Sequence, residues 1–237
     1  MVKHSRRYRE MAQLVDPEKL YTPEEAVELV GKIATTKFDE TVELHLRTSA
    51  DPRNSEQMIR GVTALPHGLG KDVRVLVFAS GEATEIARQA GADYVGEDDL
   101  IKKIEEGWLE FDVGLAVPEV MGKVGRLGRI LGRKGLMPNP RTGTLVQPRD
   151  LPRVIEEAKK GRLEFRMDRT AIIHSPVGKG NFEPQRLIEN IAALVDSVMR
   201  IRPPSVKGSF ISSAYLTTTM GPSITLDLPS LLSLTVE

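Results

Sequence analysis

The stretch Val73-Arg74-Val75-Leu76-Val77-Phe78-Ala79 decides the fold, together with the Ser80-Gly81 pair that follows it. Its apolar residues run almost without interruption, which is typical of a strand buried on both faces of a parallel sheet. Ser80-Gly81 then opens a predicted helix. The alternation continues with predicted strands over 93–95 and 111–117 and predicted helices over 82–90, over 98–106, from Pro118 and over 150–160. Strands that alternate with helices predict parallel pairing, with helices on both faces of the sheet.

The residues on either side of this block have a different pattern. Thr22 can cap a helix that starts at Pro23, and apolar side chains recur at helical spacing as far as Ile33. Residues 41–47 alternate apolar and polar side chains, which predicts a strand with one face in water. Further elements are predicted as strands over 59–65, 163–166 and 170–174, a helix over 184–200, and a hairpin from 209–219 and 223–228.

We therefore predict an α/β protein with two domains. A discontinuous α+β domain is built from residues 1–67 and 160–237, and a Rossmann-like three-layer α/β domain, residues 68–159, is inserted into it. The chain crosses between the two domains twice, and two connections permit a hinge. A length of 237 residues is sufficient for two domains of modest size.

The composition is that of an ordinary folded protein, with 40% hydrophobic and 28% charged residues. No run approaches the roughly 18 apolar residues that a membrane helix requires, so we expect no membrane partner. The absence of cysteine excludes disulfides and thiol chemistry, and it agrees with a cytoplasmic location. The four histidines show no pair at a metal-binding spacing, and we expect neither a metal nor another cofactor.

The charges are balanced overall but separated along the chain. The 33 basic and 33 acidic residues give a net charge of zero, which by itself argues against a nucleic-acid-binding protein. However, residues 82–119 hold eleven acids and three bases, a net of −8, and residues 123–153 hold eight bases and one acid, a net of +7. A polyanion responds to this local field and not to the average. The two blocks could pair with each other or with different partners.

A glycine-rich basic segment, Gly122 to Pro140, is the first candidate for ligand binding. Its glycines let the backbone approach another molecule closely, and its basic residues add charge beside accessible amides. A P-loop needs Ser or Thr after a Gly-Lys pair, but the Gly-Lys pairs here are followed by Ile, Asp, Val or Gly. The dinucleotide pattern also fails, because Glu183 stands where its last glycine belongs. Two interpretations stay open: a connector with solvated charges, and a contact with RNA backbone or with protein.

The sequence contains no recognisable constellation of an acid, a base or a nucleophile beside a ligand loop. We therefore expect no catalytic residues and no enzymatic activity. A nucleotide-dependent enzyme that uses the Rossmann-like insert is kept as an alternative, but analogy of fold alone does not justify it.

The segment Gly128-Arg129-Ile130-Leu131-Gly132-Arg133-Lys134-Gly135-Leu136-Met137-Pro138-Asn139-Pro140 resembles the motif of the bacterial ribosomal protein L1 family. Four further stretches agree with that family in the same order along the chain. They are Lys37–Thr41, Leu65–Lys71, Gly91–Gly96 and Thr217–Pro222. Each stretch is weak alone, but five in order, spread over nearly the full length, are a specific resemblance.

The resemblance implies a two-domain structural constituent of the large ribosomal subunit. Such a protein binds the ribosomal RNA of the mobile stalk beside the tRNA exit site and assists the release of deacylated tRNA. It also implies translational repression through the leader of the protein's own mRNA. The implied partners are therefore large-subunit ribosomal RNA, the protein's own mRNA, and tRNA at the exit site. A regulatory RNA-binding protein outside the ribosome is the alternative.

The stretch Thr217–Pro222 offers groups that suit RNA. Strand alternation places Thr217 and Thr219 on one face, where their hydroxyls can bond ribose or phosphate oxygens. Met220 can pack on a sugar or base, and Gly221 leaves the backbone open. A plain hairpin with a glycine turn explains the same residues without RNA. In the family that the stretch resembles, this motif is the one that contacts RNA.

Phe38 follows Lys37 and precedes two acids, which is an unusual place for a core aromatic residue. One interpretation is a ring that packs on RNA beside a lysine that pairs with phosphate. The other is a partly buried residue at the start of a strand. The resemblance places RNA contacts here and also at Thr41 and Ser213. By charge and location, Arg166 and Lys207 are predicted phosphate partners, whereas His174 is assigned no chemistry.

Overall fold

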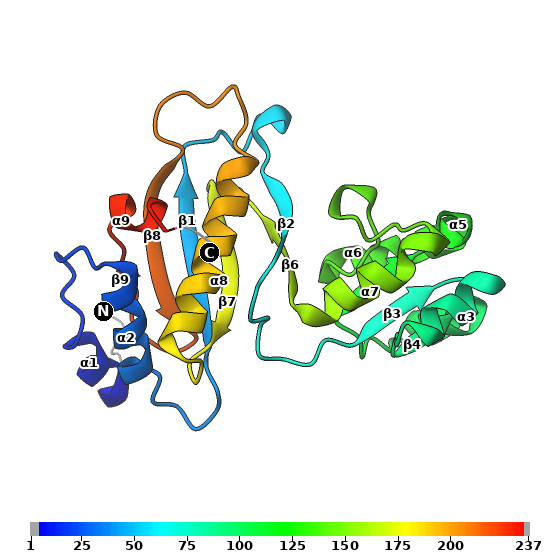
Figure 1. The fold of residues 1–237 in the computed structure, drawn as a ribbon, viewed down its shortest axis with the longest axis horizontal. Helices are drawn as coiled ribbons and strands as arrows, with labels where there is room; N and C mark the ends of the chain where they lie inside the picture. Colours follow the sequence, from blue (N-terminus) through cyan, green and yellow to red (C-terminus); the bar gives the residue numbers. More distant parts are fainter. Residues whose placement is uncertain (1–4, 235–237) are drawn as a thin grey trace. The chain divides into compact units, whose positions relative to one another are not determined.

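The computed structural model describes residues 5–234, and the chain divides into two compact units. Unit 1 contains the described residues up to Gly70 and from Leu163 onward, and unit 2 is Lys71–Arg162 (Figure 1). These limits differ by three residues from the predicted domain limits at 67/68 and 159/160. Residues 1–4 and 235–237 of the predicted discontinuous domain lie outside the described residues. That each unit is a domain able to fold by itself stays a prediction.

Unit 1 is built around a four-stranded antiparallel sheet in the order β7-β1-β8-β9. Its elements are α1 (Arg6–Ala12), α2 (Pro23–Ile33), β1 (Thr41–Thr48), η1 (Ser55–Gln57), β2 (Arg60–Ala64), β6 (Arg162–Arg166, which begins at the last residue of unit 2), β7 (Ile172–Lys179), α8 (Pro184–Arg200), β8 (Ile211–Thr218), β9 (Ile224–Thr225) and α9 (Leu228–Leu232). Strands β2 and β6 form a separate two-stranded sheet. The sheet around β1 thus joins strands from both ends of the sequence.

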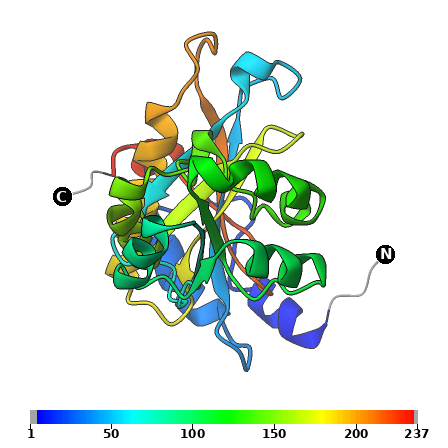
Figure 2. The same ribbon diagram turned by 90° about the vertical axis from the view of Figure 1, so that its right-hand side faces the viewer.

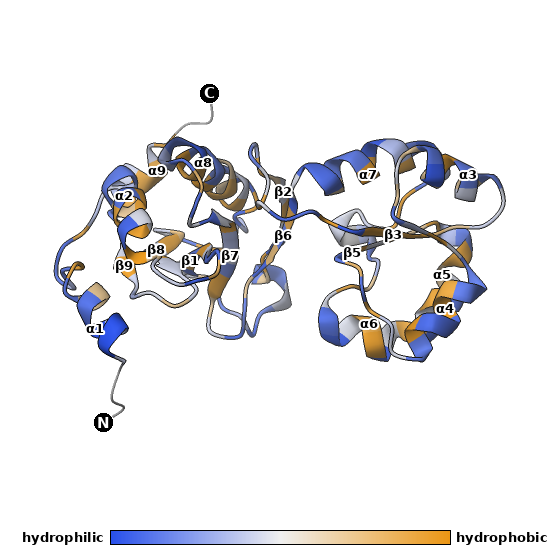
Figure 3. Cartoon of the chain, turned by 90° about the horizontal axis from the view of Figure 1, so that it is seen from below, coloured by the Kyte–Doolittle hydropathy of each residue, from blue (hydrophilic) through white to orange (hydrophobic). Residues whose placement is uncertain are grey.

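One face of this sheet is buried and the other is open. Val42, Leu44 and Leu46 of β1 are fully buried, whereas Glu43 and His45 between them are partly exposed. The buried side chains share a core with the apolar stripes of α2 and α8. Figure 3 shows these two helices lying together on one side of strands β7, β1 and β8. The predicted strand with one wet face is confirmed.

The local signals that begin the helices of unit 1 act as expected. The hydroxyl of Thr22 accepts a hydrogen bond from the amide of Glu25, and Pro23 is the first helical residue of α2. Helix α8 covers Pro184–Arg200, as its amphipathic pattern predicts. With 17 residues it is the longest helix in the described chain, and no helix there is long and apolar enough to cross a bilayer.

Unit 2 contains a three-stranded parallel sheet in the order β4-β3-β5. Its elements are β3 (Val75–Phe78), α3 (Glu82–Gln89), β4 (Tyr94–Gly96), α4 (Asp98–Glu105), β5 (Val113–Ala116), η2 (Pro118–Val120), α5 (Met121–Val124), η3 (Gly125–Leu127), α6 (Gly128–Lys134), η4 (Pro140–Thr142), η5 (Pro148–Asp150) and α7 (Leu151–Lys160). Figure 2 shows the helices of this unit gathered around its short strands.

The central strand β3 explains why helices cover both faces of this sheet, because all four of its residues are buried. Val75 and Val77 pack in one core with residues of α3 and α7. Leu76 and Phe78 pack on the other side with residues of α4, α5 and α6. The predicted parallel sheet with helices on both faces is confirmed.

The connector interpretation of the glycine-rich segment is wrong for residues 122–134. They form α5, η3 and α6, because Val124, Leu127 and Leu131 recur at helical spacing and are fully buried. Packing of these three side chains outweighs the low helix propensity of the glycines between them. Helices α1 and α9 were not expected, and β7 is longer than the predicted strand over 170–174.

Candidate nucleic-acid interface

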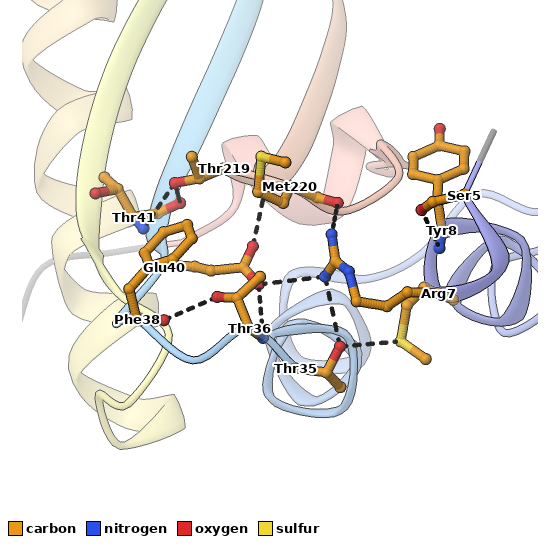
Figure 4. A network of polar contacts seen from close by, with 11 residues as sticks. Ser5, Arg7, Tyr8, Thr35, Thr36, Phe38, Glu40, Thr41, Thr219 and Met220 are labelled. Carbon is orange, nitrogen blue, oxygen red and sulfur yellow. Dashed lines mark hydrogen bonds and ion pairs between the residues drawn. The ribbon is translucent and has the colours of Figure 1, made fainter. Parts of the chain in front are cut away.

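Antiparallel pairing of β1 with β8 brings together two segments that lie far apart in the sequence. Thr41 begins β1, and Thr219 follows the last residue of β8. The amide of Thr219 donates to the carbonyl of Thr41 at 3.0 Å, and the amide of Thr41 donates to the Thr219 hydroxyl at 3.0 Å (Figure 4). The segment before β1 therefore lies beside the turn after β8. We call this region, Lys37 to Thr41 with Thr217 to Gly221, the terminal surface.

Two large apolar side chains of the terminal surface are exposed. Phe38 is 54% exposed and Met220 is 51% exposed, so neither belongs to the core. Lys37 beside Phe38 is exposed as well. The interpretation of Phe38 as a partly buried strand residue is therefore wrong. An aromatic ring, a thioether and a cation displayed together provide stacking and charge, both of which suit a nucleic acid.

The buried side chain of Glu40 links the two halves of the terminal surface by hydrogen bonds. Its carboxylate is buried, and it accepts hydrogen bonds from the amide of Thr36 at 3.3 Å and from the amide of Met220 at 3.0 Å. Burial opposes ionisation of this carboxyl group, but the hydrogen bonds from Met220 and Thr36 outweigh it and lower its pKa. Glu40 was not among the predicted site residues. Its position two residues before the inward-facing Val42 is the signal that places it on the buried face.

Gly221 is required by the close approach of the turn to α2. A Cβ atom at this position would lie 2.4 Å from the Thr218 hydroxyl oxygen and 2.7 Å from a methyl carbon of Ile33. The amide of Gly221 also closes the turn by donating to the carbonyl of Thr218 at 3.2 Å. A side chain here would move the turn that carries Met220.

The open face of the sheet continues away from the terminal surface with a chain of polar contacts. The Thr217 hydroxyl lies 2.9 Å from Nε2 of His45, and Nδ1 of His45 lies 2.8 Å from Nδ1 of His174. Nε2 of His174 in turn lies 3.5 Å from the carboxylate of Asp168. Burial and the neighbouring His174 lower the pKa of His45, against the opposite effect of Glu43. Sequence inspection missed this pair because the register of β1 against β7 brings it together.

Three predicted residues lie away from the terminal surface. Ser213 is on the open face of β8, opposite Arg47 near the other end of β1. Lys207 is exposed before β8 begins, so the whole eight-residue strand, about 27 Å long, separates it from Thr219. Arg166 is exposed at the end of β6 in the two-stranded sheet. These residues stay predicted contacts outside the cluster that the structure brings together.

The charged blocks of unit 2 pair with each other at one lysine. Lys123 lies 2.8 Å from a carboxylate oxygen of Glu97 and 3.0 Å from one of Asp98. Within the part of the chain that the structure describes, Arg126, Arg129, Arg133 and Lys134 form no salt bridge. Glycines 122, 125, 128 and 132 of the same helices have open space where a side chain would be. The helices of unit 2 therefore present cationic side chains beside glycine positions where no neighbouring atom covers the backbone.

No group of three histidine, aspartate or glutamate side chains among residues 5–234 is arranged to hold a metal ion. The terminal surface presents hydroxyls, two exposed apolar side chains and the cation of Lys37. The Ribosomal protein L1p/L10e family matches residues 30–222, a range that includes both halves of the terminal surface.

The chain belongs to this family.

Curated relatives agree with that membership over almost their whole length. The "Large ribosomal subunit protein uL1" of Thermomicrobium roseum is 57% identical over 228 residues, which are 96% of this chain and 95% of the relative. The protein with the same name from Fervidobacterium nodosum is 55% identical over 229 residues, 96% of this chain and 97% of its own. That of Dehalococcoides mccartyi strain BAV1 is 54% identical over 228 residues, 96% of each chain.

The resemblance to the ribosomal protein L1 family, inferred from five short stretches, is confirmed by these comparisons. Membership in a family of ribosomal proteins favours a structural role in translation over catalysis. The alternative of a nucleotide-dependent enzyme therefore has no support from the family.

Proposed function

We propose that this chain is a structural constituent of the large ribosomal subunit, located on cytoplasmic ribosomes, and that the terminal surface binds ribosomal RNA of the mobile stalk near the tRNA exit site. The names of the relatives support the first part of this proposal. The observation that carries the second part is the joint exposure of Phe38 and Met220 on a hydrogen-bonded framework made by both chain ends.

The groups of the terminal surface can each make a different kind of contact with RNA. Phe38 stacks on a base or packs on a sugar, and Lys37 beside it pairs with a phosphate. The Thr219 hydroxyl accepts from the amide of Thr41 and donates to its carbonyl at 3.3 Å, so one lone pair is left. That lone pair can accept a hydrogen bond from a ribose 2′-OH, which distinguishes RNA from DNA.

The remaining predicted residues extend the contact beyond the terminal surface. Ser213 can bond RNA from the far end of the open sheet face, while Lys207 before β8 and Arg166 at the end of β6 can pair with phosphates. Such cationic contacts add affinity without reading sequence and make binding dependent on salt. Recognition then comes from the shape of the RNA that fits Phe38 and Met220.

Two further partners are part of the proposal. A leader segment of the protein's own mRNA that folds like the stalk RNA would compete for the same terminal surface, which provides a physical basis for translational repression. In unit 2, Arg126, Arg129, Arg133 and Lys134 stand beside bare glycine backbone, and they suit the phosphate backbone of tRNA. Contact with tRNA there would assist release of deacylated tRNA at the exit site.

The test is recovery of the protein from lysate followed by sequencing of the bound RNA. The wild type, Met220→Ala and the matched control Met58→Ala are compared, since Met58 is also exposed but lies outside the terminal surface. We expect the wild type and Met58→Ala to enrich stalk ribosomal RNA, and Met220→Ala to lose much of it. Enrichment of unrelated transcripts by the wild type would favour a regulatory RNA-binding protein outside the ribosome. Equal recovery of stalk RNA by all three proteins would remove Met220 from the interface.

A further inference from the structure

Arg7 of helix α1 contacts the turn after β8. Arg7 donates from Nη2 to the backbone carbonyl of Met220 at 3.0 Å, and its Nη1 lies 3.5 Å from the Thr35 hydroxyl (Figure 4). Helix α1 has seven residues, none of them buried. Met11 packs against the core from this helix, and Arg7 adds polar contacts to the turn and to Thr35.

Arg7 is also the cation nearest to a buried carboxylate. Its Nη1 lies 3.8 Å from Glu40, whose side chain is fully buried, and this is the one salt bridge of Glu40 within residues 5–234. A buried charge without a partner is costly, so the pair keeps the ionised form of Glu40 acceptable in the interior. The ionised form is the one that accepts the hydrogen bond from the amide of Met220.

Glu40 and Arg7 together hold both polar groups of the Met220 backbone. Glu40 accepts from its amide at 3.0 Å, and Arg7 donates to its carbonyl at 3.0 Å. With both groups fixed, the side chain of Met220 has a set direction, and half of it is exposed. Removal of the guanidinium frees the carbonyl and weakens the hold of Glu40 on the amide.

We infer that Arg7 is a positioning residue for RNA binding, which sets the orientation of Met220 and Thr219 from helix α1 and makes no phosphate contact itself. This inference rests on the proposed function of the terminal surface. Both terminal nitrogens of the guanidinium are directed to protein acceptors, at Met220, Thr35 and Glu40. Helix α1 then contributes to RNA binding because its Arg7 holds the turn that carries Met220 in place.

The test measures affinity for a stalk RNA fragment over a range of salt concentrations. The variants are Arg7→Gln, Arg7→Lys and the control Arg6→Gln, which removes the same charge from the same helix at a side chain that is 90% exposed and paired with Glu10. We expect Arg7→Gln to weaken binding about tenfold with an unchanged salt dependence, Arg7→Lys to restore part of the loss, and Arg6→Gln to have little effect.

Two outcomes would overturn the inference while the proposed function stands. One is wild-type affinity in Arg7→Gln. The other is a loss of affinity in which the negative slope of log K against log salt becomes smaller in magnitude by about 0.7–0.9, which is the mark of a lost phosphate contact. If the wild type binds an unrelated hairpin as well as it binds stalk RNA, the proposed function fails and this inference fails with it.

A spectroscopic measurement separates positioning from unfolding. In the amide spectrum of the full chain, Arg7→Gln should shift the resonances of Met220 and Gly221 and leave those of β3 in unit 2 unchanged. Unmoved Met220 and Gly221 resonances would show that Arg7 does not hold the turn, and a general loss of dispersion would show that Arg7 acts on the fold as a whole. Either result would overturn the inference.

Discussion

The carboxylate of Glu40 accepts a hydrogen bond from the backbone amide of Met220 at 3.0 Å, although 180 residues separate the two along the chain. The contact is possible because β1 and β8 are antiparallel neighbours, so the residue before β1 meets the turn after β8. A second bond between Thr41 and Thr219 supports the same junction. The proposed RNA surface therefore depends on correct pairing of strands from opposite ends of the sequence.

Substitution of Gly221 by alanine should damage both the fold and the interface. The new Cβ would lie 2.4 Å from the Thr218 hydroxyl oxygen, so the turn or α2 must shift. Overpacking of this kind costs roughly 1–3 kcal/mol, and displacement of Met220 should weaken RNA binding as well. Gly132→Ala is the control, since open space surrounds that position in α6 and alanine favours a helix by up to about 1 kcal/mol. Urea unfolding should show opposite signs for the two variants, and the same sign would contradict the geometry.

Phe38→Ala should reduce RNA binding much more than stability. The ring is 54% exposed, so its removal takes little apolar area out of the core. Loss of a stacking aromatic residue typically costs about 1–3 kcal/mol in binding to nucleic acid. Leu20→Ala is the matched control, because Leu20 is 58% exposed and lies outside the terminal surface. Isothermal titration with stalk RNA compares the two, and an equal effect of both variants would exclude a direct role of the ring.

The stability of unit 1 should fall as the solution becomes mildly acidic. Burial and His174 lower the pKa of His45 from its ordinary value of 6.5, against the effect of Glu43. Between the lowered value and 6.5 the unfolded chain binds more protons than the folded chain, so the free energy of unfolding decreases as pH falls below about 6.5. His45→Asn should remove part of this dependence. Urea unfolding at about pH 7.5 and about pH 5.5 measures it, and identical pH dependence in both proteins would disprove the role of His45.

A variant that joins residues 1–67 to 160–237 should keep most of the affinity for stalk RNA. The predicted contacts all lie in unit 1, whereas unit 2 has a separate sheet and two cores of its own. The isolated insert, residues 68–159, should fold and should not bind this RNA specifically. Circular dichroism and gel-shift titration test both expectations. Specific binding by the insert alone would reverse the roles assigned to the two units.

The secondary structure of the chain was largely predictable, because the pattern of apolar residues is local. The apolar stripe of Pro184–Arg200 and the alternation at Val42, Leu44 and Leu46 gave elements that the structure contains. A helix was predicted from Pro118, but its continuation through the glycine-rich residues up to Lys134 was not. Glycine content favours a loop, and only the buried side chains of the finished core reveal the helical spacing.

The candidate site was predictable only where its residues form motifs. Phe38, Thr219 and Met220 stand out as unusual residues in short stretches, and the structure brings them together. The spacing to Val42 places Glu40 on the buried face, but its partner Met220 is 180 residues away, and Arg7 bonds Met220 across 213 residues. No local pattern therefore reveals what either residue holds. The His45–His174 pair depends on the register between β1 and β7, which the sequence does not specify residue by residue.

Equilibrium binding to stalk ribosomal RNA, measured beside an unrelated hairpin at physiological ionic strength, addresses the role of the terminal surface most directly. The wild type should prefer the stalk RNA, and Thr219→Val and Met220→Ala should each lose roughly 1–3 kcal/mol of that binding while their folds stay intact. Equal affinity of the wild type for both RNAs, or unchanged affinity in both variants, would contradict the account.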